Sequence, residues 1–391
     1  MSALAPLRTT VVDVDLDAIV DNFDALRRRA ENAEVIAVVK ADGYGHGVEA
    51  IAETLAGAGA AMLAVVTAEE AMTIRAAGIR APVLVLVGGS ERPEIEAAIA
   101  ADCAMVVWDV DHARLIDELA ASAGRRAAVH FKVDTGLTRL GAPLGEAVAR
   151  YRAIQGLRHI AVEGVMTHFA TADDPDPAIA RSQFARFSEF LDAAGTLPRF
   201  VHAAASAGVA AFGALDRCTA IRPGISLYGL HAAAHQAVAL PLRPALTWRS
   251  RVRRVAAAAK GTGVSYGHAY RLPRDGRIAT VPVGYGDGLP RMLGGRGRML
   301  VGGRALPFAG RICMDLVMLD VTDLPAVKEG DEVVVIGTQG AATQTADDLA
   351  AALGTVNYEI VTGIRRRVPR RYHRGGRVVA QRTLVDGYVR L

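Results

Sequence analysis

The sequence predicts an α/β protein: a (β/α)8 barrel, of the TIM-barrel type, followed by a mostly-β C-terminal domain. From residue 35 to about 230, short apolar runs alternate with longer segments rich in Ala, Leu, Glu and Arg. Eight such β-then-α units of this size close naturally into a barrel. The alternative is an open doubly wound sheet, which usually carries a GxGxxG fingerprint in its first turn, and the sequence has no such fingerprint there.

The barrel elements follow from periodicity and composition. The predicted barrel strands are 35–40, 61–67, 82–87, 103–108, 127–134, 161–168, 200–205 and 218–228. The segments with helical spacing of apolar residues are 48–58, 68–77, 93–101, 111–123, 145–154 and 179–194.

The pattern changes after residue 240, where strand-like runs are separated by turns that contain Gly and Asp. Pro241 and Pro244 mark the change, which predicts two domains, 1–240 and 241–391. The predicted strands of the second domain are 247–256, 277–283, 299–301, 304–308, 312–321 and 332–336.

Composition limits the possible functions. The chain has 391 residues, of which 51% are hydrophobic and 22% charged, as expected for a globular protein of two domains. The net charge of +4 is spread along the chain, so neither a nucleic-acid nor a membrane partner is expected, and the arginine run 365–371 is more typical of a solvated or interface surface.

The cysteines and the N-terminus predict a location in the reducing cytoplasm. Cys103, Cys218 and Cys313 show no CxxC spacing and no cluster with histidine, which argues against a disulfide framework and against a metal site. Asp13, Asp15 and Asp17 interrupt the first residues, so we expect no signal peptide, and no run is long enough to span a membrane.

Lys40 is the first candidate for chemistry. It follows the uncharged apolar run 35–39, and an ammonium at the end of a buried strand must find a partner or lose its proton. A neutral amine at a barrel rim is a nucleophile for carbonyl groups, including the aldehyde of pyridoxal phosphate. If Lys40 is considered alone, a structural role is the better interpretation. Its side chain would then reach solvent before a turn that contains Gly43, Gly45 and Gly47.

Other polar residues stand at the predicted strand ends, where barrels place their active sites. They are Tyr44, Lys132, Arg139, His168, Ser206 and Arg222. A single buried His or Ser is more often a hydrogen-bonded core residue than a catalyst. Their convergence on one rim predicts a polar, charged ligand.

Six motifs together resemble the alanine racemase family. They are residues 39–47 (VKADGYGHG), 132–136 (KVDTG), 167–173 (THFATAD), 222–225 (RPGI), 264–267 (VSYG) and 312–315 (ICMD). The resemblance implies a pyridoxal-phosphate enzyme with a (β/α)8 barrel and a C-terminal β domain. It also implies a head-to-tail homodimer in which the C-terminal domain contributes to the active site of the partner subunit.

The resemblance assigns catalytic roles to four residues. Racemisation removes the Cα proton from one face of the substrate and returns it on the other, so it needs two acid–base groups. By resemblance, Lys40 forms the Schiff base with the cofactor and serves one face, and Tyr266 of the partner subunit serves the other. His168 and Arg222 form a line that ends at the pyridine nitrogen, where a guanidinium disfavours protonation and so disfavours transamination.

The resemblance also assigns binding roles. Tyr44, Ser206, Tyr358 and the amides of Gly224 and Ile225 would hold the phosphate, and Arg139 would contact the cofactor or the substrate carboxylate. Met314 of the partner subunit would bind the substrate carboxylate. Lys132 corresponds to a lysine that is often carbamylated, with a plain ion pair as the alternative. The substrate corridor would contain Asp173, Arg291 and Arg311.

Three residues at two places depart from the family pattern. Ala205 stands where the family commonly has Asn before the phosphate-binding serine, which predicts a looser cofactor shell. Leu137 and Thr138 stand where it commonly has Met-Gly or Met-Asn before Arg139, and these changes bear on turnover and inhibitor sensitivity.

The predicted activity is the interconversion of L-alanine and D-alanine, which supplies a peptidoglycan precursor. A broader-specificity racemase of the same fold is the main alternative, although such enzymes usually carry secretion signals. A non-catalytic pyridoxal-phosphate carrier would leave residues 264–267 and the β domain unexplained. Decarboxylase relatives place an acid at the position of Arg222.

Overall fold

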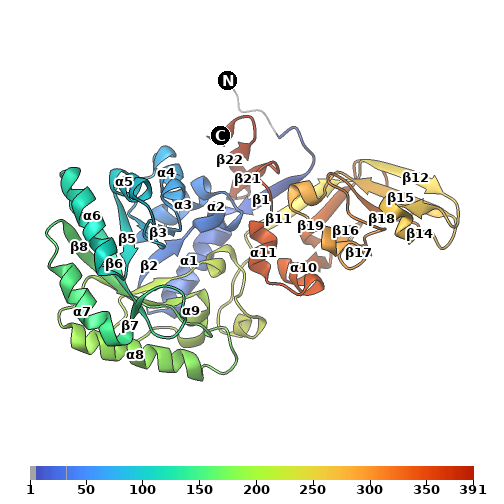
Figure 1. The fold of residues 1–391 in the computed structure, drawn as a ribbon. Helices are drawn as coiled ribbons and strands as arrows, with labels where there is room; N and C mark the ends of the chain where they lie inside the picture. Colours follow the sequence, from blue (N-terminus) through green and yellow to red (C-terminus); the bar gives the residue numbers. More distant parts are fainter. Residues whose placement is uncertain (1–5, 32) are drawn as a thin grey trace. The chain divides into compact units, whose positions relative to one another are not determined.

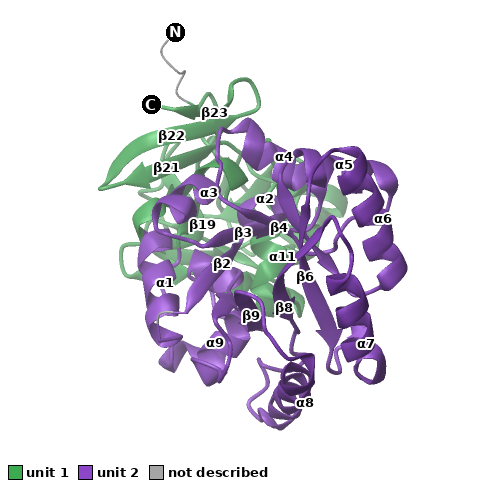
Figure 2. Cartoon of the chain, turned by 90° about the vertical axis from the view of Figure 1, so that its left-hand side faces the viewer, with its two compact units in different colours: residues 1–17, 44–50, 245–391 green, residues 18–43, 51–244 purple. Residues whose placement is uncertain are grey.

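The computed structural model describes residues 6–31 and 33–391. Their contacts divide the chain into two compact units. Unit 1 comprises Met1–Asp17, Tyr44–Ala50 and Ala245–Leu391, and unit 2 comprises Ala18–Gly43 and Ile51–Pro244 (Figure 2). Two segments that precede residue 51 therefore belong with the C-terminal part of the chain, whereas the sequence-based division at residue 240 grouped them with the barrel.

Unit 2 is a closed parallel barrel. Within the described residues, the eight strands β2–β6 and β8–β10 follow one another around the barrel, and the pairings of β5 with β6 and of β10 with β2 close it. Their bounds are β2 (Glu34–Val38), β3 (Met62–Val65), β4 (Val83–Val85), β5 (Cys103–Val107), β6 (Ala127–Asp134), β8 (Ile160–Met166), β9 (Phe200–Ala205) and β10 (Ala220–Arg222). The short strand β7 (Ala142–Pro143) pairs with the end of β6. The predicted (β/α)8 architecture is confirmed.

Helices alternate with the barrel strands and surround them (Figure 1). Their bounds are α1 (Leu16–Arg29), α3 (Val48–Gly57), α4 (Ala68–Ala76), α5 (Arg92–Ala100), α6 (Val110–Ser122), α7 (Leu144–Gln155), α8 (Ala178–Ala194) and α9 (Ser206–Phe212). Side-chain caps mark two of the starts, since Thr67 accepts from the Glu70 amide and Asp109 from the amides of Asp111 and His112. None of the helices in the described part of the chain is both long and apolar enough to cross a bilayer.

The strands that carry the candidate residues are shorter than predicted. β2 ends at Val38, so Lys40 lies in the turn after the strand and not in the strand itself. β10 covers only Ala220–Arg222 of the predicted strand 218–228, because Pro223 has no N–H to donate and the chain then enters the 3₁₀ helix η1 (Ile225–Tyr228). Arg222 therefore stands at the carboxyl end of its strand.

Unit 1 is built on a mixed sheet of order β17-β16-β19-β11-β1-β21-β22-β23, with β20 paired to β19. Smaller antiparallel sheets have the orders β12-β15-β18 and β13-β14. The strand bounds are β1 (Val11–Asp15), β11 (Leu246–Arg251), β12 (Arg254–Ala258), β13 (Gly263–Val264), β14 (Tyr270–Arg271), β15 (Gly276–Val281), β16 (Arg298–Val301), β17 (Arg304–Pro307), β18 (Val317–Asp320), β19 (Glu332–Gln339), β20 (Ala342–Gln344), β21 (Arg370–Arg374), β22 (Arg377–Thr383) and β23 (Gly387–Arg390). Helices α10 (Ala346–Leu353) and α11 (Asn357–Thr362) complete the unit.

Several sequence-based strands of unit 1 were wrong in extent. The run 247–256 is two strands in different sheets, β11 and β12. The run 312–321 is a strand only over β18, and its first residues form a loop that contains Met314. Strand β1 was missed because its core-facing valines alternate with aspartates, and β21 was missed because three of its five residues are arginines. Strands β22 and β23 were also missed.

The segment Tyr44–Ala50 is held to the rest of unit 1 by close packing and by Arg370. A Cβ at Gly45 would lie 2.0 Å from the carbonyl oxygen of Val361, and one at Gly47 would lie 1.9 Å from the Tyr372 hydroxyl oxygen, so only glycine fits at either position. The fully buried guanidinium of Arg370 donates to the carbonyl of Gly45 at 3.0 Å. The glycines of this motif therefore serve packing within unit 1.

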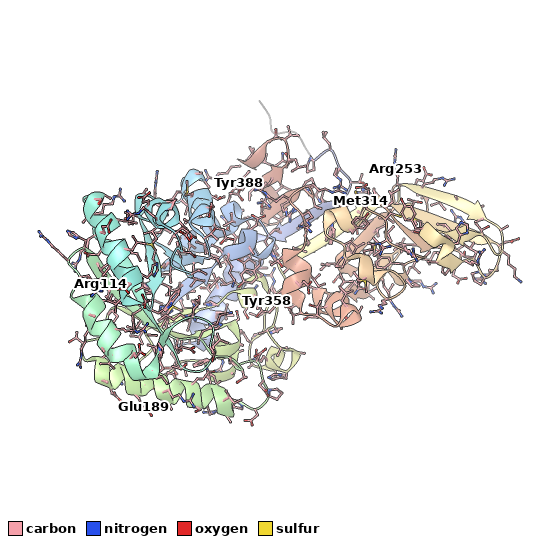
Figure 3. The ribbon with its side chains drawn as sticks, viewed as in Figure 1. Arg114, Glu189, Arg253, Met314, Tyr358 and Tyr388 are labelled. Atoms are coloured by element: carbon pink, nitrogen blue, oxygen red, sulfur yellow. The ribbon has the colours of Figure 1, made fainter. Side chains whose placement is uncertain are left out.

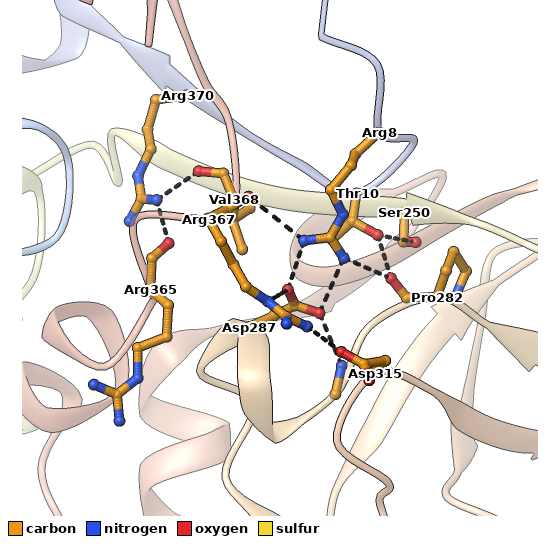
Figure 4. Close-up of polar contacts among 11 residues, drawn as sticks. Arg8, Thr10, Ser250, Pro282, Asp287, Asp315, Arg365, Arg367, Val368 and Arg370 are labelled. Atoms are coloured by element: carbon orange, nitrogen blue, oxygen red, sulfur yellow. Dashed lines mark hydrogen bonds and ion pairs between the residues drawn. The ribbon is translucent and has the colours of Figure 1, made fainter. Parts of the chain in front are cut away.

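A buried carboxylate organises the loops around β15 in unit 1 (Figure 4). Asp287 has no exposed side-chain surface, accepts hydrogen bonds from Arg8 at 2.6 and 3.1 Å and from Arg367 at 2.7 Å, and accepts the Gly284 amide at 3.1 Å. Burial alone would raise the pKa of Asp287, but the hydrogen bonds from Arg8 and Arg367 outweigh it and hold the pKa below its usual value.

We expect Asp287→Asn to lower the free energy of unfolding by about 3 kcal/mol at pH 7, because it leaves two guanidinium groups without their buried counter-ion. The folded-state pKa of Asp287 is lowered, so its contribution is present above the unfolded-state pKa and is lost as pH falls through the folded value. The difference between wild type and variant should therefore shrink below about pH 4. Urea unfolding measured from pH 3 to pH 7 tests both expectations.

Asp315→Asn is the matched control. Asp315 also pairs with Arg367, at 2.5 Å, but its side chain is 60% exposed, so its loss should cost less than about 1 kcal/mol. Equal effects of the two substitutions would contradict the role assigned to Asp287.

Candidate active site

Lys40 opens an unusual turn after β2. Ala41, Asp42, Gly43 and Tyr44 have φ values of 51°, 57°, 61° and 50°, a left-handed run that costs residues with a Cβ about 1–2 kcal/mol each. The amide of Gly43 donates to the carbonyl of Val39 at 2.9 Å and closes the turn. The backbone at Lys40 is therefore held in one specific conformation at the rim of the barrel.

Cationic side chains surround the Lys40 amine. Burial lowers the pKa of Lys40, and the charges of Arg139 and Arg222 lower it further, while Glu70 opposes them. Burial and the same two arginines lower the pKa of Lys132, on β6, to about 8. Both amines are therefore poised to be neutral more readily than an exposed lysine, and the rim attracts anions.

Arg222 lies at the centre of this rim and is almost fully buried. One nitrogen of its guanidinium donates to Nδ1 of His202 at 2.6 Å, and the other to Nδ1 of His168 and to the carbonyl of Thr167, both at 3.0 Å. Burial and the charge of Arg222 lower the pKa of both histidines well below the usual value, so both are neutral acceptors. This arrangement fixes the guanidinium plane.

The hydrogen bonds also assign the histidine tautomers. Because Nδ1 of His202 accepts from Arg222, its Nε2–H donates to Nδ1 of His130 at 2.8 Å. His130 is fully buried, and burial with the charge of Arg222 lowers its pKa to about 3. Neither histidine was predicted as a site residue, although each is a polar residue within a predicted buried strand. Gly164 makes room for the His130 ring, since a Cβ there would lie 2.5 Å from its Nδ1.

Ser206 follows β9, and its hydroxyl group is hydrogen-bonded to the loop after β10. Its Oγ accepts the amides of Gly224 at 2.9 Å and Ser226 at 3.2 Å, which leaves its own hydrogen as a donor. The Gly224 amide, which is predicted to hold the phosphate, donates to the Ser206 hydroxyl in this structure, and Ile225 begins η1 beside it. Ala205 adds no polar side-chain atom there.

The loop that carries Arg139 is organised by Asp134. One carboxylate oxygen of Asp134 accepts the amides of Gly136 at 2.9 Å, Leu137 at 3.0 Å and Thr138 at 3.1 Å. Thr138 has a φ of 55°, a left-handed conformation that is a genuine outlier for a β-branched residue. The departure at residue 138 is therefore a source of backbone strain next to Arg139.

Tyr44 and Tyr358 lie together in unit 1. Their ring centroids are 6.1 Å apart at an interplanar angle of 54°, and Tyr358 lies on α11, where it is labelled in Figure 3. The structure thus brings together the two tyrosines that the resemblance assigns to the phosphate.

Tyr266 and Met314 are exposed residues of unit 1, with 68% and 52% of their surface accessible. Tyr266 lines an open pocket of about 360 Å³ with Cys313, the residue before Met314, which is labelled in Figure 3. The Ser265 hydroxyl joins the two loops by donating to the carbonyl of Arg311 at 2.6 Å. The residues predicted to enter the active site of a partner subunit therefore lie on adjacent exposed loops.

The predicted corridor residues fall in both units. Arg311 lies beside Gly267, and its loop packs near that of Arg291, because a Cβ at Gly294 would lie 3.4 Å from both the Arg291 carbonyl oxygen and the Arg311 Cα. Asp173 is exposed in the loop after β8, in unit 2. The structure thus brings Arg291 and Arg311 together.

Two family models match this chain. The model described as "Alanine racemase, N-terminal domain" covers residues 14–232, and "Alanine racemase, C-terminal domain" covers residues 245–372. The chain belongs to the alanine racemase family. The resemblance that the motifs predicted is confirmed.

Relatives in this family match over nearly the whole chain. An alanine racemase from Halothermothrix orenii is 41% identical over 372 residues, which cover 93% of this chain and 97% of that protein. One from Symbiobacterium thermophilum is 42% identical over 369 residues, which cover 94% of this chain and 97% of that protein.

Solved alanine racemases also share the fold. The crystal structure of the Bacillus anthracis alanine racemase with bound L-Ala-P has a TM-score of 0.90 at 36% identity, covering 98% of this chain and all of that one. The alanine racemase from a D-cycloserine producing Streptomyces lavendulae has a TM-score of 0.88 at 36% identity, covering 95% of this chain and 98% of that one.

The neutral histidines predict a loss of stability in mild acid. Their folded-state pKa values are lowered, so the unfolded chain binds more protons as soon as pH falls below about 6.5. Between these two pKa values, each such histidine makes the free energy of unfolding fall by about 1.4 kcal/mol for each unit by which pH is lowered. We expect His130→Asn to reduce the slope between pH 6 and pH 4 by that amount in urea unfolding experiments.

His235→Asn provides the control, because His235 is exposed in the 3₁₀ helix η2 (Ala234–Val238). An unchanged slope in His130→Asn would contradict the assignment of His130 as a buried neutral residue.

Strain at Thr138 predicts that Thr138→Gly stabilises the protein. Removing the left-handed penalty of about 1–2 kcal/mol outweighs the added unfolded-chain entropy of glycine, about 0.5–1 kcal/mol, for a net gain of about 0.5–1 kcal/mol. Thermal unfolding measures this gain. Thr138→Ala keeps a Cβ and should gain less, so a larger gain from alanine than from glycine would argue against backbone strain.

Proposed function

We propose that this protein interconverts L-alanine and D-alanine with pyridoxal phosphate as its cofactor. The observation that carries the proposal is the cationic rim of the barrel, where the Lys40 amine lies near Arg139, Lys132 and Arg222. Arg222 donates hydrogen bonds to two neutral histidines there. Full-length similarity to alanine racemases supports the same reaction.

The residues at the rim fit this cofactor. The positive field suits a phosphate, and the Ser206 hydroxyl has a hydrogen to donate. By the family resemblance, Arg222 would face the ring nitrogen of the cofactor. By the family resemblance, Tyr44 and Tyr358, whose rings lie together in unit 1, would also hold the phosphate. When bound, pyridoxal phosphate supplies an aldehyde that condenses with amines and a ring that withdraws electrons from the substrate Cα.

We assign the two acid–base positions to Lys40 and to Tyr266 of the partner subunit. Burial lowers the pKa of Lys40, which makes its neutral Nζ more accessible than that of an exposed lysine and suits it to take a proton from one face of the substrate. His168 accepts from Arg222 at Nδ1, so its Nε2–H is a donor that can stabilise the anion of a phenol. Tyr266 would then return a proton to the other face.

Arg222 favours racemisation over other reactions of the same cofactor. It stays a cation and a donor, because its acceptors are neutral histidines and a carbonyl. If the ring nitrogen of the cofactor faced Arg222, the guanidinium would disfavour its protonation, so the ring would withdraw electrons less strongly and more of the negative charge would remain near the substrate Cα. This favours return of the proton to Cα, which is racemisation.

We propose that the active enzyme is a homodimer with shared sites. Tyr266 and Met314 are exposed on adjacent loops of unit 1, as expected for side chains that a second copy of the chain covers. In this arrangement the Met314 amide and Arg139 bind the substrate carboxylate, and Asp173, Arg291 and Arg311 line its corridor.

We further propose that Lys132 carries a carbamate. Lys132 is buried beside Arg222 and Arg139, its pKa is about 8, and it forms no ion pair with a carboxylate among the described residues. A neutral amine is the form that adds carbon dioxide, and the anionic product would be stabilised by the two arginines. Use of the product in peptidoglycan and a cytoplasmic location stay predictions.

Chiral product analysis of single variants and their mixture tests the function and the shared site together. Wild type should form D-alanine from L-alanine far faster than it racemises L-serine or L-lysine. Lys40→Ala and Tyr266→Ala should each be inactive. After subunit exchange in an equal mixture, half of the dimers carry one intact site of two, so about a quarter of wild-type activity should return.

Equal rates on all three amino acids would replace the alanine assignment with a broad-specificity racemase. No recovery in the mixture, with exchange verified by mass spectrometry, would rule out a site shared between subunits. The absence of a visible absorption band after pyridoxal phosphate is added would rule out the cofactor.

A further inference from the structure

Glu70 lies in the first turn of α4 and bridges the ends of two barrel strands. One oxygen of its carboxylate accepts the Ala41 amide at 2.6 Å, and the other accepts the Val66 amide at 2.8 Å. Ala41 directly follows Lys40, and Val66 directly follows β3. The half-buried carboxylate thus ties the Lys40 turn to the neighbouring strand.

The Lys40 turn needs such a tie. Ala41 and Asp42 each carry a Cβ and adopt the left-handed conformation, which is unfavourable for residues other than glycine. Inside the turn, the Gly43 amide bonds to the Val39 carbonyl, whereas the Ala41 amide points to Glu70. A hydrogen bond to a charged acceptor is stronger than one between neutral groups, so Glu70 stabilises the turn at one of its left-handed residues, Ala41.

Glu70 also affects the charge at the rim. Burial, Arg139 and Arg222 all lower the pKa of Lys40, and Glu70 is the group that raises it. A carboxylate here partly balances a site in which Lys132 is also close to both arginines.

We propose that Glu70 is a positioning residue that sets the orientation and the reactivity of the Lys40 amine by holding the left-handed turn that follows it. The part of this inference that concerns catalysis rests on the function proposed above. The part that concerns Lys40 itself holds in the protein without cofactor.

The test uses the full-length protein freed of cofactor and the variant Glu70→Gln. The glutamine carbonyl can accept one amide, but its NH₂ group would face the other, and the charge is lost. We expect hydrogen exchange at the Ala41 amide to speed up at least about tenfold, in keeping with the loss of one charge-assisted hydrogen bond. We also expect the pH profile of Lys40 acylation by acetic anhydride, followed by mass spectrometry, to move to lower pH.

Glu69→Gln is the matched control, because Glu69 is the preceding residue of the same helix turn and its side chain is exposed. It should leave both measurements unchanged. Glu70→Asp restores the charge with a shorter side chain, so it should return the acylation profile toward that of wild type while exchange at Ala41 stays faster.

A purely structural role for Glu70 would lower the melting temperature without moving the acylation profile, and that result would overturn the proposal. So would equal behaviour of Glu70→Gln and Glu69→Gln. If Glu70→Gln does not fold, Glu70→Asp alone decides, since unchanged exchange at Ala41 would then refute the tie. Wild-type protein that fails to racemise alanine but shows the expected Glu70 effects would refute the proposed function and leave this inference intact.

Discussion

The hydrogen bonds of the Arg222 guanidinium are the constraint on which the rest of the barrel site depends. A guanidinium is always charged and can only donate, so every neighbour must accept or be repelled. His202 and His168 accept, and each is therefore held neutral with its second nitrogen as the donor. This one cation orients two histidines, one of which bonds to His130. Its charge also lowers the pKa of His130, Lys132 and Lys40.

The site is consequently a cluster of cations with few counter-ions. Lys40, Lys132, Arg139 and Arg222 face one region, and the acidic groups that oppose their mutual repulsion are Glu70 beside Lys40 and Asp134 beside Lys132. Such an excess is unfavourable unless an anion binds or an amine is neutral. Both outcomes would serve the proposed reaction, which needs a bound phosphate, a bound carboxylate and a basic amine.

The glycine-rich motif after Lys40 serves two different purposes. Gly43 belongs to the left-handed turn, whereas Gly45 and Gly47 are required where Tyr44–Ala50 packs against α11 and Tyr372 within unit 1. The sequence predicted a tight turn for all three glycines. The packing role could not be predicted, because the contacting residues lie more than 300 positions further along the chain and only the folded unit brings them together.

The sequence by itself determined the barrel, the family and the residue types at the site, because strand and helix periodicity and short motifs are local properties. It placed Lys40, Arg139, His168 and Arg222 at strand ends, and the structure brings the charges of Lys40, Arg139 and Arg222 to one rim around a neutral His168. Only the tertiary structure decided that β1 joins the sheet of unit 1, that His130 and His202 support Arg222, and that Glu70 holds the turn after Lys40. Each of these features depends on contacts between residues that are distant in the sequence. Their hydrogen bonds and the burial of their charges exist only once the chain has folded.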